Sequence, residues 1–166
     1  MFEKIEKEGV ISFYYNCEDM FSDVCTLSAY MVKNASAEAG SLLDDFAITD
    51  DEREVYDYSL VKAAMAVYEA FSKIGKGYVP IDRRVGYDDN YTTFKIVDNK
   101  SYSDSHVEFA DATIEDCLRY GILAEYYSIN ANDILRKMAQ DKFASNLLLL
   151  NQRLFQLKKK RVSSLL

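Results

Sequence analysis

Apolar residues recur at helical spacing in four parts of the chain, and residues that begin or end helices bound each part. In the first part, Met20, Val24 and Leu27 fall three or four positions apart. Asn16 stands just before them and is a residue type that caps helix starts. This pattern predicts a helix over 17–34.

The clearest start signal is Thr49 followed three residues later by Glu52. In such a capping box the Thr oxygen accepts from the third amide of the helix, and the Glu returns to the amide of the Thr. Apolar positions then keep a helical period until Gly75, a residue type that ends helices. We therefore expect a second helix over 50–74.

The third and fourth helices are separated by a polar break. Thr113 can open the third helix, and Asn130–Asp133 both ends it and caps a fourth that continues to about residue 157. Gly121 lies inside the third helix, where Gly costs about 1 kcal/mol relative to Ala. We expect Gly121 to mark a close contact between helices.

The period changes between the second and third helices. Residues 91–97 are rich in β-branched and aromatic side chains, 98–100 resemble a turn, and 101–109 could return as a second strand. An isolated hairpin is marginal, so this one must pack on the helices or on another subunit. Residues 9–15 form either a short strand or an apolar lead-in.

These elements predict a mainly α fold, a four-helix bundle-like domain with a β-hairpin inserted between helices two and three. A chain of 166 residues that is 49% apolar fits one domain with a sizeable core. We expect a single helical domain over 1–166, with a lead-in over 1–16, a hairpin-bearing loop over 76–110 and a basic tail over 158–166.

The fourth helix has two apolar stripes, whereas a helix on the surface of a monomer needs only one. Such a helix is either central in the bundle or also meets a neighbouring subunit. One stripe has the 4, 3, 4, 3 spacing of a helix-packing seam and comprises Phe143, Leu147, Leu150, Leu154 and Leu157, and the second comprises Ala144, Leu148 and Phe155. The candidate residues for contact with another subunit are Leu148, Phe155, Leu147 and Leu154.

Charge is distributed unevenly along the chain. The net charge is −7, which disfavours non-specific binding of nucleic acid by the whole surface. Residues 1–141 carry 14 basic and 27 acidic residues, a net −13, and every later charge is positive. The basic tail can be a solvated helix end, or it can contact nucleic acid or an acidic neighbour through Lys158, Lys159, Lys160 and Arg161.

The residue pattern offers little catalytic chemistry. His106 is the only histidine and has no metal-ligand partner at a fixed spacing, so we expect a structural or exposed side chain. The cysteines Cys17, Cys25 and Cys117 form no CxxC motif, and we expect small buried apolar residues rather than disulfides or nucleophiles. The sequence contains no P-loop, GxGxxG or GxSxG motif. We expect a protein without catalytic residues, metal or cofactor; an enzyme would need a site assembled only by folding.

Two stretches of the chain, Val24–Phe71 and Ala112–Gln152, resemble small structural proteins of tailed bacteriophages. The similar proteins are of the head–tail connector, neck or tail-ring type, especially those from phages of gut Bacteroidetes. The resemblance implies a virion component that forms a ring between portal and tail, without catalysis or cofactor. The short words that carry it are Thr26–Tyr30, Ile48–Glu54, Ile114–Leu118, Ala124–Tyr127 and Lys142–Phe143 with the leucines that follow.

The function expected is therefore that of a ring-forming virion protein in the neck or tail of a bacteriophage. Its partners would be copies of itself, the portal and neighbouring neck or tail proteins, with DNA contact through the basic tail but no membrane. It would be assembled in the host bacterial cytoplasm. The alternative is a cellular helical adaptor or regulator that binds another protein without catalysis.

Overall fold

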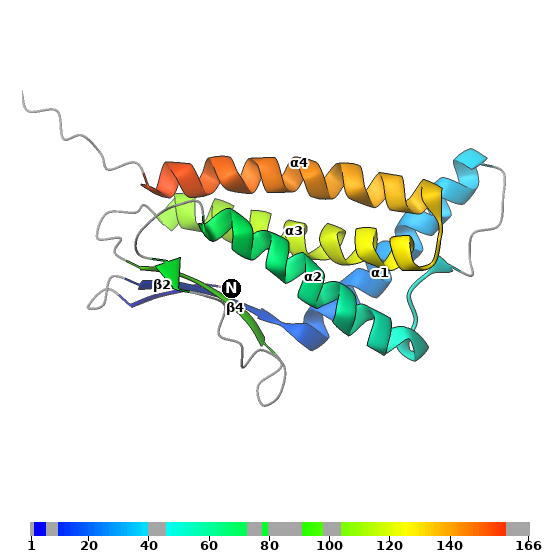
Figure 1. The fold of residues 1–166 in the computed structure, drawn as a ribbon, viewed down its shortest axis with the longest axis horizontal. Coiled ribbons are helices and arrows are strands. Elements are labelled where there is room, and N and C mark those ends of the chain that lie inside the picture. The colour runs from blue at the N-terminus through cyan, green and yellow to red at the C-terminus, as the bar shows by residue number, and fades with distance from the viewer. Residues whose placement is uncertain are drawn as a thin grey trace, which may run out of the picture.

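The computed structural model describes residues 2–5, 10–39, 46–72, 78–79, 91–97 and 104–158. The protein is mainly α, with four helices in a bundle-like arrangement and an antiparallel hairpin between the second and third (Figure 1). The helices are α1 (Cys17–Ala39), α2 (Arg53–Ser72), α3 (Asp104–Ile129) and α4 (Asp133–Lys158), and the short 3-10 helix η2 (Asp50–Glu52) leads into α2. The strands are β1 (Phe2–Ile5), β2 (Val10–Asn16), β3 (Tyr78–Val79) and β4 (Tyr91–Val97).

The four strands form one antiparallel sheet in the order β1-β2-β4-β3. In the central pair Phe13 lies opposite Phe94, and both side chains are buried. Phe71, at the end of α2, packs edge-on against Phe13 and stacks on Phe94, with ring centroids 6.0 and 5.5 Å apart. The sheet is thereby held under the end of the bundle where α2 finishes and α3 begins (Figure 1). The N-terminal residues that could have been a simple lead-in are thus two strands of this sheet.

The hairpin differs from the predicted one in its second arm. The strand predicted over 91–97 is β4, but its hairpin partner is β3, which precedes it, and not 101–109. Residues from Asp104 onwards belong to α3, which begins nine residues before Thr113. Val107 and Ala110 are fully buried at helical spacing, so this segment continues the apolar face of α3.

The predicted starts of the first two helices are present, whereas the start predicted at Thr113 is wrong, because Thr113 lies inside α3. The Asn16 side-chain oxygen accepts from the amides of Glu18 and Asp19, at 2.9 and 3.1 Å, and so caps α1. The Glu52 carboxylate accepts from the Thr49 amide at 3.1 Å, the reciprocal bond of the capping box. In this protein the box begins η2, from which α2 continues.

A tight turn joins α3 to α4 and makes the two helices antiparallel neighbours. Ala131 adopts a left-handed conformation with φ of 53°. The Asn132 side chain accepts from the Leu135 amide at 3.0 Å, and this bond caps α4. The polar break at 130–133 was predicted from the sequence and is confirmed.

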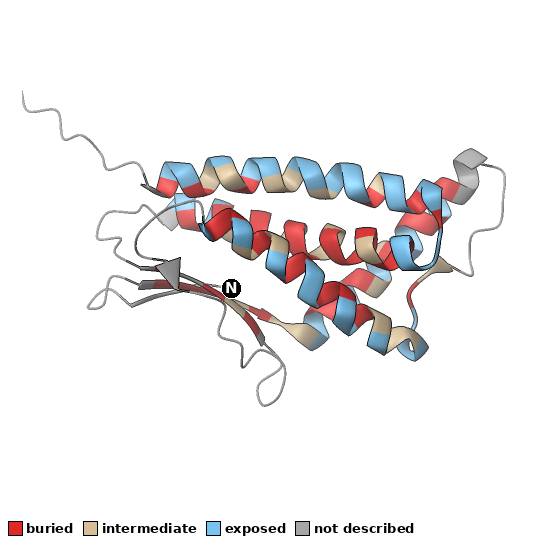
Figure 2. Cartoon of the chain, viewed as in Figure 1, coloured by how far each residue is buried: buried red, intermediate tan, exposed pale blue. Residues whose placement is uncertain are grey.

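Helix α3 occupies the centre of the bundle. It contacts α1, α2 and α4, and also β1. Its fully buried residues lie on more than one side of the helix and include Val107, Ala110, Ile114, Cys117, Leu118, Ile122 and Leu123. Figure 2 shows α3 mainly in the colour of buried residues, whereas the outward side of α4 is mainly exposed.

Gly121 marks the point where three helices meet. A Cβ atom added there would lie 2.8 Å from Cβ of Ala63 in α2 and 2.9 Å from Cε2 of Phe143 in α4. Real Cβ atoms essentially never approach other atoms so closely. The prediction that Gly121 permits a close helix contact is therefore confirmed.

Candidate functional site

The apolar residues of α4 divide between two opposite faces. The inner face carries Leu135, Ala139, Leu150, Leu154 and Leu157, each no more than 1% exposed. Phe143 and Leu147 are partly buried and pack against the same core. The first stripe predicted from the sequence is therefore the packing seam of α4 on the bundle.

The second stripe of α4 lies on the side away from the core. Leu148 is 64% exposed and Phe155 is 58% exposed, and Ala144 is also exposed. Leu148 and Phe155 are seven residues apart, so two helical turns separate them on nearly the same line. The central helix of the bundle is α3 and not α4, so a central position of α4 does not account for the second stripe.

Two of the four predicted contact residues belong instead to the inner face. Leu154 is 1% exposed, and Leu147 packs against the core from a partly buried position. Leu147 and Leu154 are covered because they belong to the stripe with 4, 3 spacing, which packs against α3, and not to the stripe that contains Leu148. Ile134, fourteen residues before Leu148, is 50% exposed but stands apart at the start of α4. The candidate contact surface on α4 therefore reduces to Leu148 and Phe155. We call this surface the α4 outer stripe.

A second exposed apolar stripe lies on α2 and was missed in the sequence. Tyr58, Val61 and Met65 are 50, 57 and 55% exposed, at i, i+3 and i+7. The buried residues of α2, such as Tyr56, Ala63 and Val67, lie on the opposite side. The spacing was visible in the sequence, but the stronger buried pattern of the same helix concealed it. We call these three residues the α2 outer stripe.

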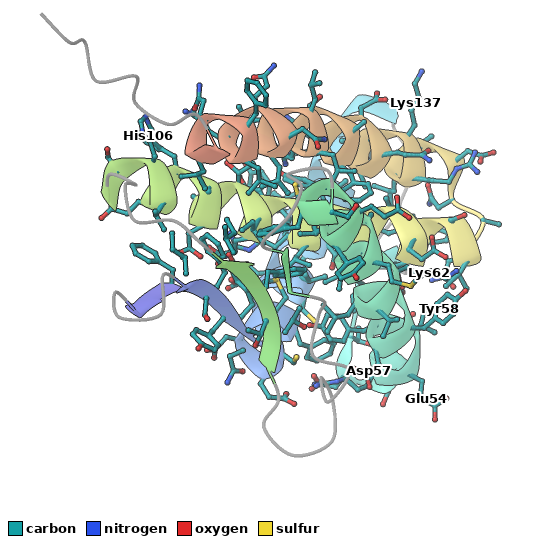
Figure 3. All side chains as sticks on the ribbon, turned by 60° about the vertical axis from the view of Figure 1, so that its left-hand side comes forward. Glu54, Asp57, Tyr58, Lys62, His106 and Lys137 are labelled. Atoms are coloured by element: carbon teal, nitrogen blue, oxygen red, sulfur yellow. The ribbon has the colours of Figure 1, made fainter. Side chains whose placement is uncertain are left out.

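The two stripes have different electrostatic surroundings. Residues 50–72, which include η2 and α2, carry six acidic and two basic residues, a net −4. Residues 133–158, the length of α4, carry two acidic and five basic residues, a net +3. Figure 3 shows Glu54, Asp57, Tyr58 and Lys62 along α2, whereas Lys137 extends from α4 in another direction.

Two of these basic side chains, Lys62 on α2 and Arg153 on α4, lie over aromatic rings of their own chain. The ammonium of Lys62 lies 5.4 Å from the ring centroid of Tyr58, so it borders the α2 outer stripe directly. The guanidinium of Arg153 lies 5.0 Å from the ring centroid of Phe109, which is 53% exposed at the start of α3. Arg153 is therefore partly committed to a contact within its own chain.

The predicted basic contact residues fall at the edge of the described chain. Lys158 is the last residue of α4, and its side chain lies outside the described part. Lys159, Lys160 and Arg161 lie outside the described residues altogether. Their contact with DNA or with an acidic neighbour stays a prediction.

The cysteine environments favour the protonated thiol. Burial raises the pKa of Cys117 to about 12. Burial also raises the pKa values of Cys17 and Cys25, both half-buried on α1. Because the thiolate is the reactive form, none of the three has the lowered pKa of a catalytic or redox-sensing cysteine. All three are free.

Tyr15, which is buried, and Asp111, which is partly buried, form a tyrosine–carboxylate pair that joins the sheet to α3. The hydroxyl of Tyr15 in β2 donates to the side chain of Asp111 in α3 at 2.6 Å and to its carbonyl at 3.1 Å. Burial, followed by the neighbouring Asp111 charge, raises the Tyr15 pKa well above its ordinary value. Tyr15 therefore remains a hydroxyl donor that fastens the sheet to α3.

The remaining candidates for metal or catalytic chemistry lie apart from one another. His106 is exposed near the start of α3 (Figure 3). Among the described residues, no three His, Cys, Asp or Glu side chains come together in a group that could hold a metal ion. Within the same ranges, none of the helices combines the length and the apolar character needed to cross a membrane.

Comparison with known proteins finds no matching family model, no matching curated protein and no matching solved structure.

Proposed function

We propose that this protein is a structural subunit that assembles with copies of itself into a ring, as part of the head–tail connector, neck or tail of a bacteriophage. The exposed α4 outer stripe, built from Leu148 and Phe155, is the single observation that carries the self-assembly. The resemblance of Val24–Phe71 and Ala112–Gln152 to phage neck and tail-ring proteins supports the location in a virion assembled in the host cytoplasm. Portal, neck and tail proteins would be the other partners.

The arrangement of exposed residues matters more than their number. Single exposed apolar residues are ordinary on a monomer surface. Here Leu148 and Phe155 lie on one line of a helix whose opposite face already supplies its packing seam. Covering these two side chains would stabilise an interface by about 1–2 kcal/mol each, given that each is already partly covered.

The distribution of side-chain chemistry supports a structural role over a catalytic one. The buried hydroxyls of Tyr15 and Tyr56 form clamps between elements, Tyr15 with Asp111 and Tyr56 with the carbonyl of Cys17. The thiols are held protonated. The conspicuous surface features of the described residues are apolar stripes and charge asymmetry, which serve protein contacts.

An adaptor that binds another protein is the second candidate, and the same stripe favours it. Anchors at i and i+7 on an exposed helix are the pattern of a helix laid in a groove of a partner. An adaptor would use the α4 outer stripe without forming an oligomer of its own.

The test is the oligomeric state of the full chain, compared with that of a variant carrying Leu148→Glu and Phe155→Glu. Light scattering coupled to size exclusion, over a wide concentration range, should show oligomers for the unsubstituted chain and a folded monomer for the variant. A matched control, Gln140→Glu with Gln156→Glu, adds the same charge at exposed polar positions of α4 and should still assemble. A strict monomer at every concentration would count against self-assembly and favour the adaptor.

The virion location has a separate test. Mass spectrometry of purified particles from the phage that encodes this chain should detect the protein in several copies per particle. Absence from particles, with the chain present in infected cells, would contradict the location even if the protein forms rings.

A further inference from the structure

We infer that the α2 outer stripe is the docking site for the basic tail, residues 158–166, of a second copy of this chain. The inference rests on the self-assembly proposed above and deepens it by naming both sides of one contact. Lys158 is the last residue of α4, and residues 159–166 lie outside the described part of the chain, so the tail enters the inference through its sequence alone.

The exposed side of α2 carries acids first and apolar side chains afterwards. Asp51 and Glu54 precede Tyr58, and the positions 51, 54, 58, 61 and 65 are spaced 3, 4, 3 and 4 residues apart. This spacing places the five side chains on one line along the helix. All five are exposed, and Figure 3 shows Glu54 and Tyr58 on the outer side of α2. Two carboxylates therefore continue the α2 outer stripe towards the start of the helix.

The two carboxylates are available to a partner. Within the described part of the chain, no ion pair engages Asp51 or Glu54. The neighbouring guanidinium of Arg53 is committed elsewhere, because it donates to two other carboxylates. Lys62, the other basic residue of α2, borders the apolar part of the line, where its ammonium lies over the ring of Tyr58. The negative charge thus lies at the start of the line, before the apolar side chains.

The basic tail has the same two kinds of side chain in the matching order. Four cations at positions 158–161 come first, and Val162, Leu165 and Leu166 follow. A tail laid parallel to α2 would bring its cations beside the two carboxylates and its apolar side chains onto the α2 outer stripe. An extended chain from 162 to 166 spans about 13 Å, and the stripe is about 10 Å long. Charge complementarity and length both favour this pairing.

The tail that docks belongs to a second copy, because the cations of one chain cannot reach its own carboxylates. Helix α4 is antiparallel to α3, so it ends at the end of the bundle where α2 finishes (Figure 1). Glu54 lies eighteen residues before Ser72, the last residue of α2, which is about 27 Å along the helix. Arg161 follows Lys158 by three residues, at most about 11 Å of extended chain.

A contact between two different surfaces of the subunit repeats. A subunit whose tail occupies one neighbour still offers its own α2 outer stripe to the tail of the next. Repeated head-to-tail contacts produce a ring when their rotation closes, and a filament when it does not. The inferred contact therefore suits a ring, which the proposed function requires.

The experiment exchanges the charges of the two surfaces in the full chain. The tail variant carries Lys159→Glu, Lys160→Glu and Arg161→Glu, and the α2 variant carries Asp51→Lys and Glu54→Lys. Sedimentation velocity should show each variant associating at least about tenfold more weakly than the unsubstituted chain. Mixed in equal amounts, the two variants should associate again, because each tail then meets a surface of opposite charge. Circular dichroism checks that both variants are folded.

A control variant separates the position of the charge from its amount. Asp19→Lys with Glu108→Lys makes the same change of charge as the α2 variant at two other exposed acids, and Asp19 also lies in the first turn of a helix. This control should associate as the unsubstituted chain does. An equal loss in the control would show that net charge, and not the α2 surface, governs association, and would overturn the docking site.

Two further variants remove apolar contact and leave every charge in place. Val61→Ser with Met65→Ser changes the α2 outer stripe, and Leu165→Ser with Leu166→Ser changes the tail. Each should weaken association about tenfold. Because Val61 and Met65 are exposed, their substitution should leave the fold intact and keeps the test decisive if a charge variant is unfolded.

The outcomes distinguish this inference from the proposed function. An unsubstituted chain that is monomeric at every concentration overturns both. Normal association of the α2 variants shows that the tail docks elsewhere, and normal association of the tail variants shows that something other than the tail covers the stripe. Either result overturns the docking site and leaves self-assembly standing. Failure of the mixed charge variants to associate, when both are folded, also overturns the pairing.

Discussion

Helices α3 and α4 have the same length, 26 residues, and both carry more apolar residues than a single stripe requires. Along the middle of α3 the surplus is covered, because α1, α2 and α4 surround it, and of its large apolar side chains only Phe109 and Ile129, near its two ends, are exposed. In α4 the inner face is covered by α3, whereas Leu148 and Phe155 face outward. The comparison shows that a doubly apolar helix has two different explanations, a central position or a second contact partner, and that one protein can contain both.

The largest difference in the free energy of unfolding is expected between substitutions of two leucines on the two faces of α4. Leu154→Ala empties a position that is 1% exposed and should lower the free energy of unfolding by about 2–5 kcal/mol. Leu148→Ala, at 64% exposure, should change it by no more than about 0.5 kcal/mol. Urea unfolding of dilute protein measures both, and equal losses would show that the two faces do not differ as described.

Gly121 tests how tightly α3 is enclosed. Gly121→Ala would place a methyl group against Ala63 and Phe143, and should destabilise the protein by about 1–3 kcal/mol. Ser128→Ala, at an exposed position of the same helix, is the control and should have little effect. If Gly121→Ala were instead stabilising, as better helix propensity alone would make it, the three-helix contact would be looser than the structure shows.

A polar clamp at the far end of α3 should have an intermediate effect. The Tyr126 hydroxyl donates to the Glu52 carboxylate, which also accepts from Thr49 in the capping box. Tyr126→Phe should lower the free energy of unfolding by about 1–2 kcal/mol, because the carboxylate loses a buried donor. Tyr120→Phe on the same helix serves as the control in thermal unfolding, and equal shifts in the two variants would argue against the clamp.

The smallest effect on stability is expected for the exposed ion pair between Arg53 and Glu18. Arg53 donates to both oxygens of Glu18, at 2.8 and 2.6 Å, and these hydrogen bonds lower the Glu18 pKa. The stabilisation is complete above the unfolded Glu pKa of about 4.3. It is lost as the pH falls through the lower folded value.

Glu18→Gln should therefore cost about 0.5 kcal/mol at neutral pH, because the pair is exposed to solvent. Thermal unfolding at a series of acid pH values measures the difference in stability between the variant and the unsubstituted chain. This difference should shrink as the pH falls below the pKa of Glu in the unfolded chain. A difference that persisted at low pH would point to a contact other than the ion pair.

Local chemistry was predictable from the sequence where neighbouring residues determine it. The caps at Asn16 and Asn132, the box at Thr49 and Glu52, and the close approach at Gly121 all follow from the chemistry of one or a few adjacent residues. The sequence leaves residues 9–15 open between a short strand and an apolar lead-in, and the structure shows strand β2 there.

The arrangement of the sheet depends on contacts that no local pattern encodes. Strand β4 pairs with β2, far away in the chain, and its short neighbour β3 precedes it. The segment 101–109, predicted as a strand, is short, and a short apolar run can fit the period of two of a strand and the period of 3.6 of a helix equally well. Packing decided between them, since Val107 and Ala110 are buried as helix residues of α3.

The candidate site could be predicted only in part, because its exposure also depends on tertiary packing. The two stripes of α4 were visible, but only tertiary packing identified which one faces outward and removed Leu147 and Leu154 from the contact surface. The α2 outer stripe was present as Tyr58, Val61 and Met65, and it escaped notice because the buried residues of that helix already explained it. A count of apolar faces for every helix would have found it.

Sedimentation velocity of the full chain as a function of concentration tests the central claim most directly, because it measures self-association without any substitution. If the chain assembles with itself, the sedimentation coefficient should shift with concentration from that of the monomer towards that of larger species, and the shift should be weaker for Leu148→Glu with Phe155→Glu. A single monomeric species at every concentration, identical for both proteins, would contradict it.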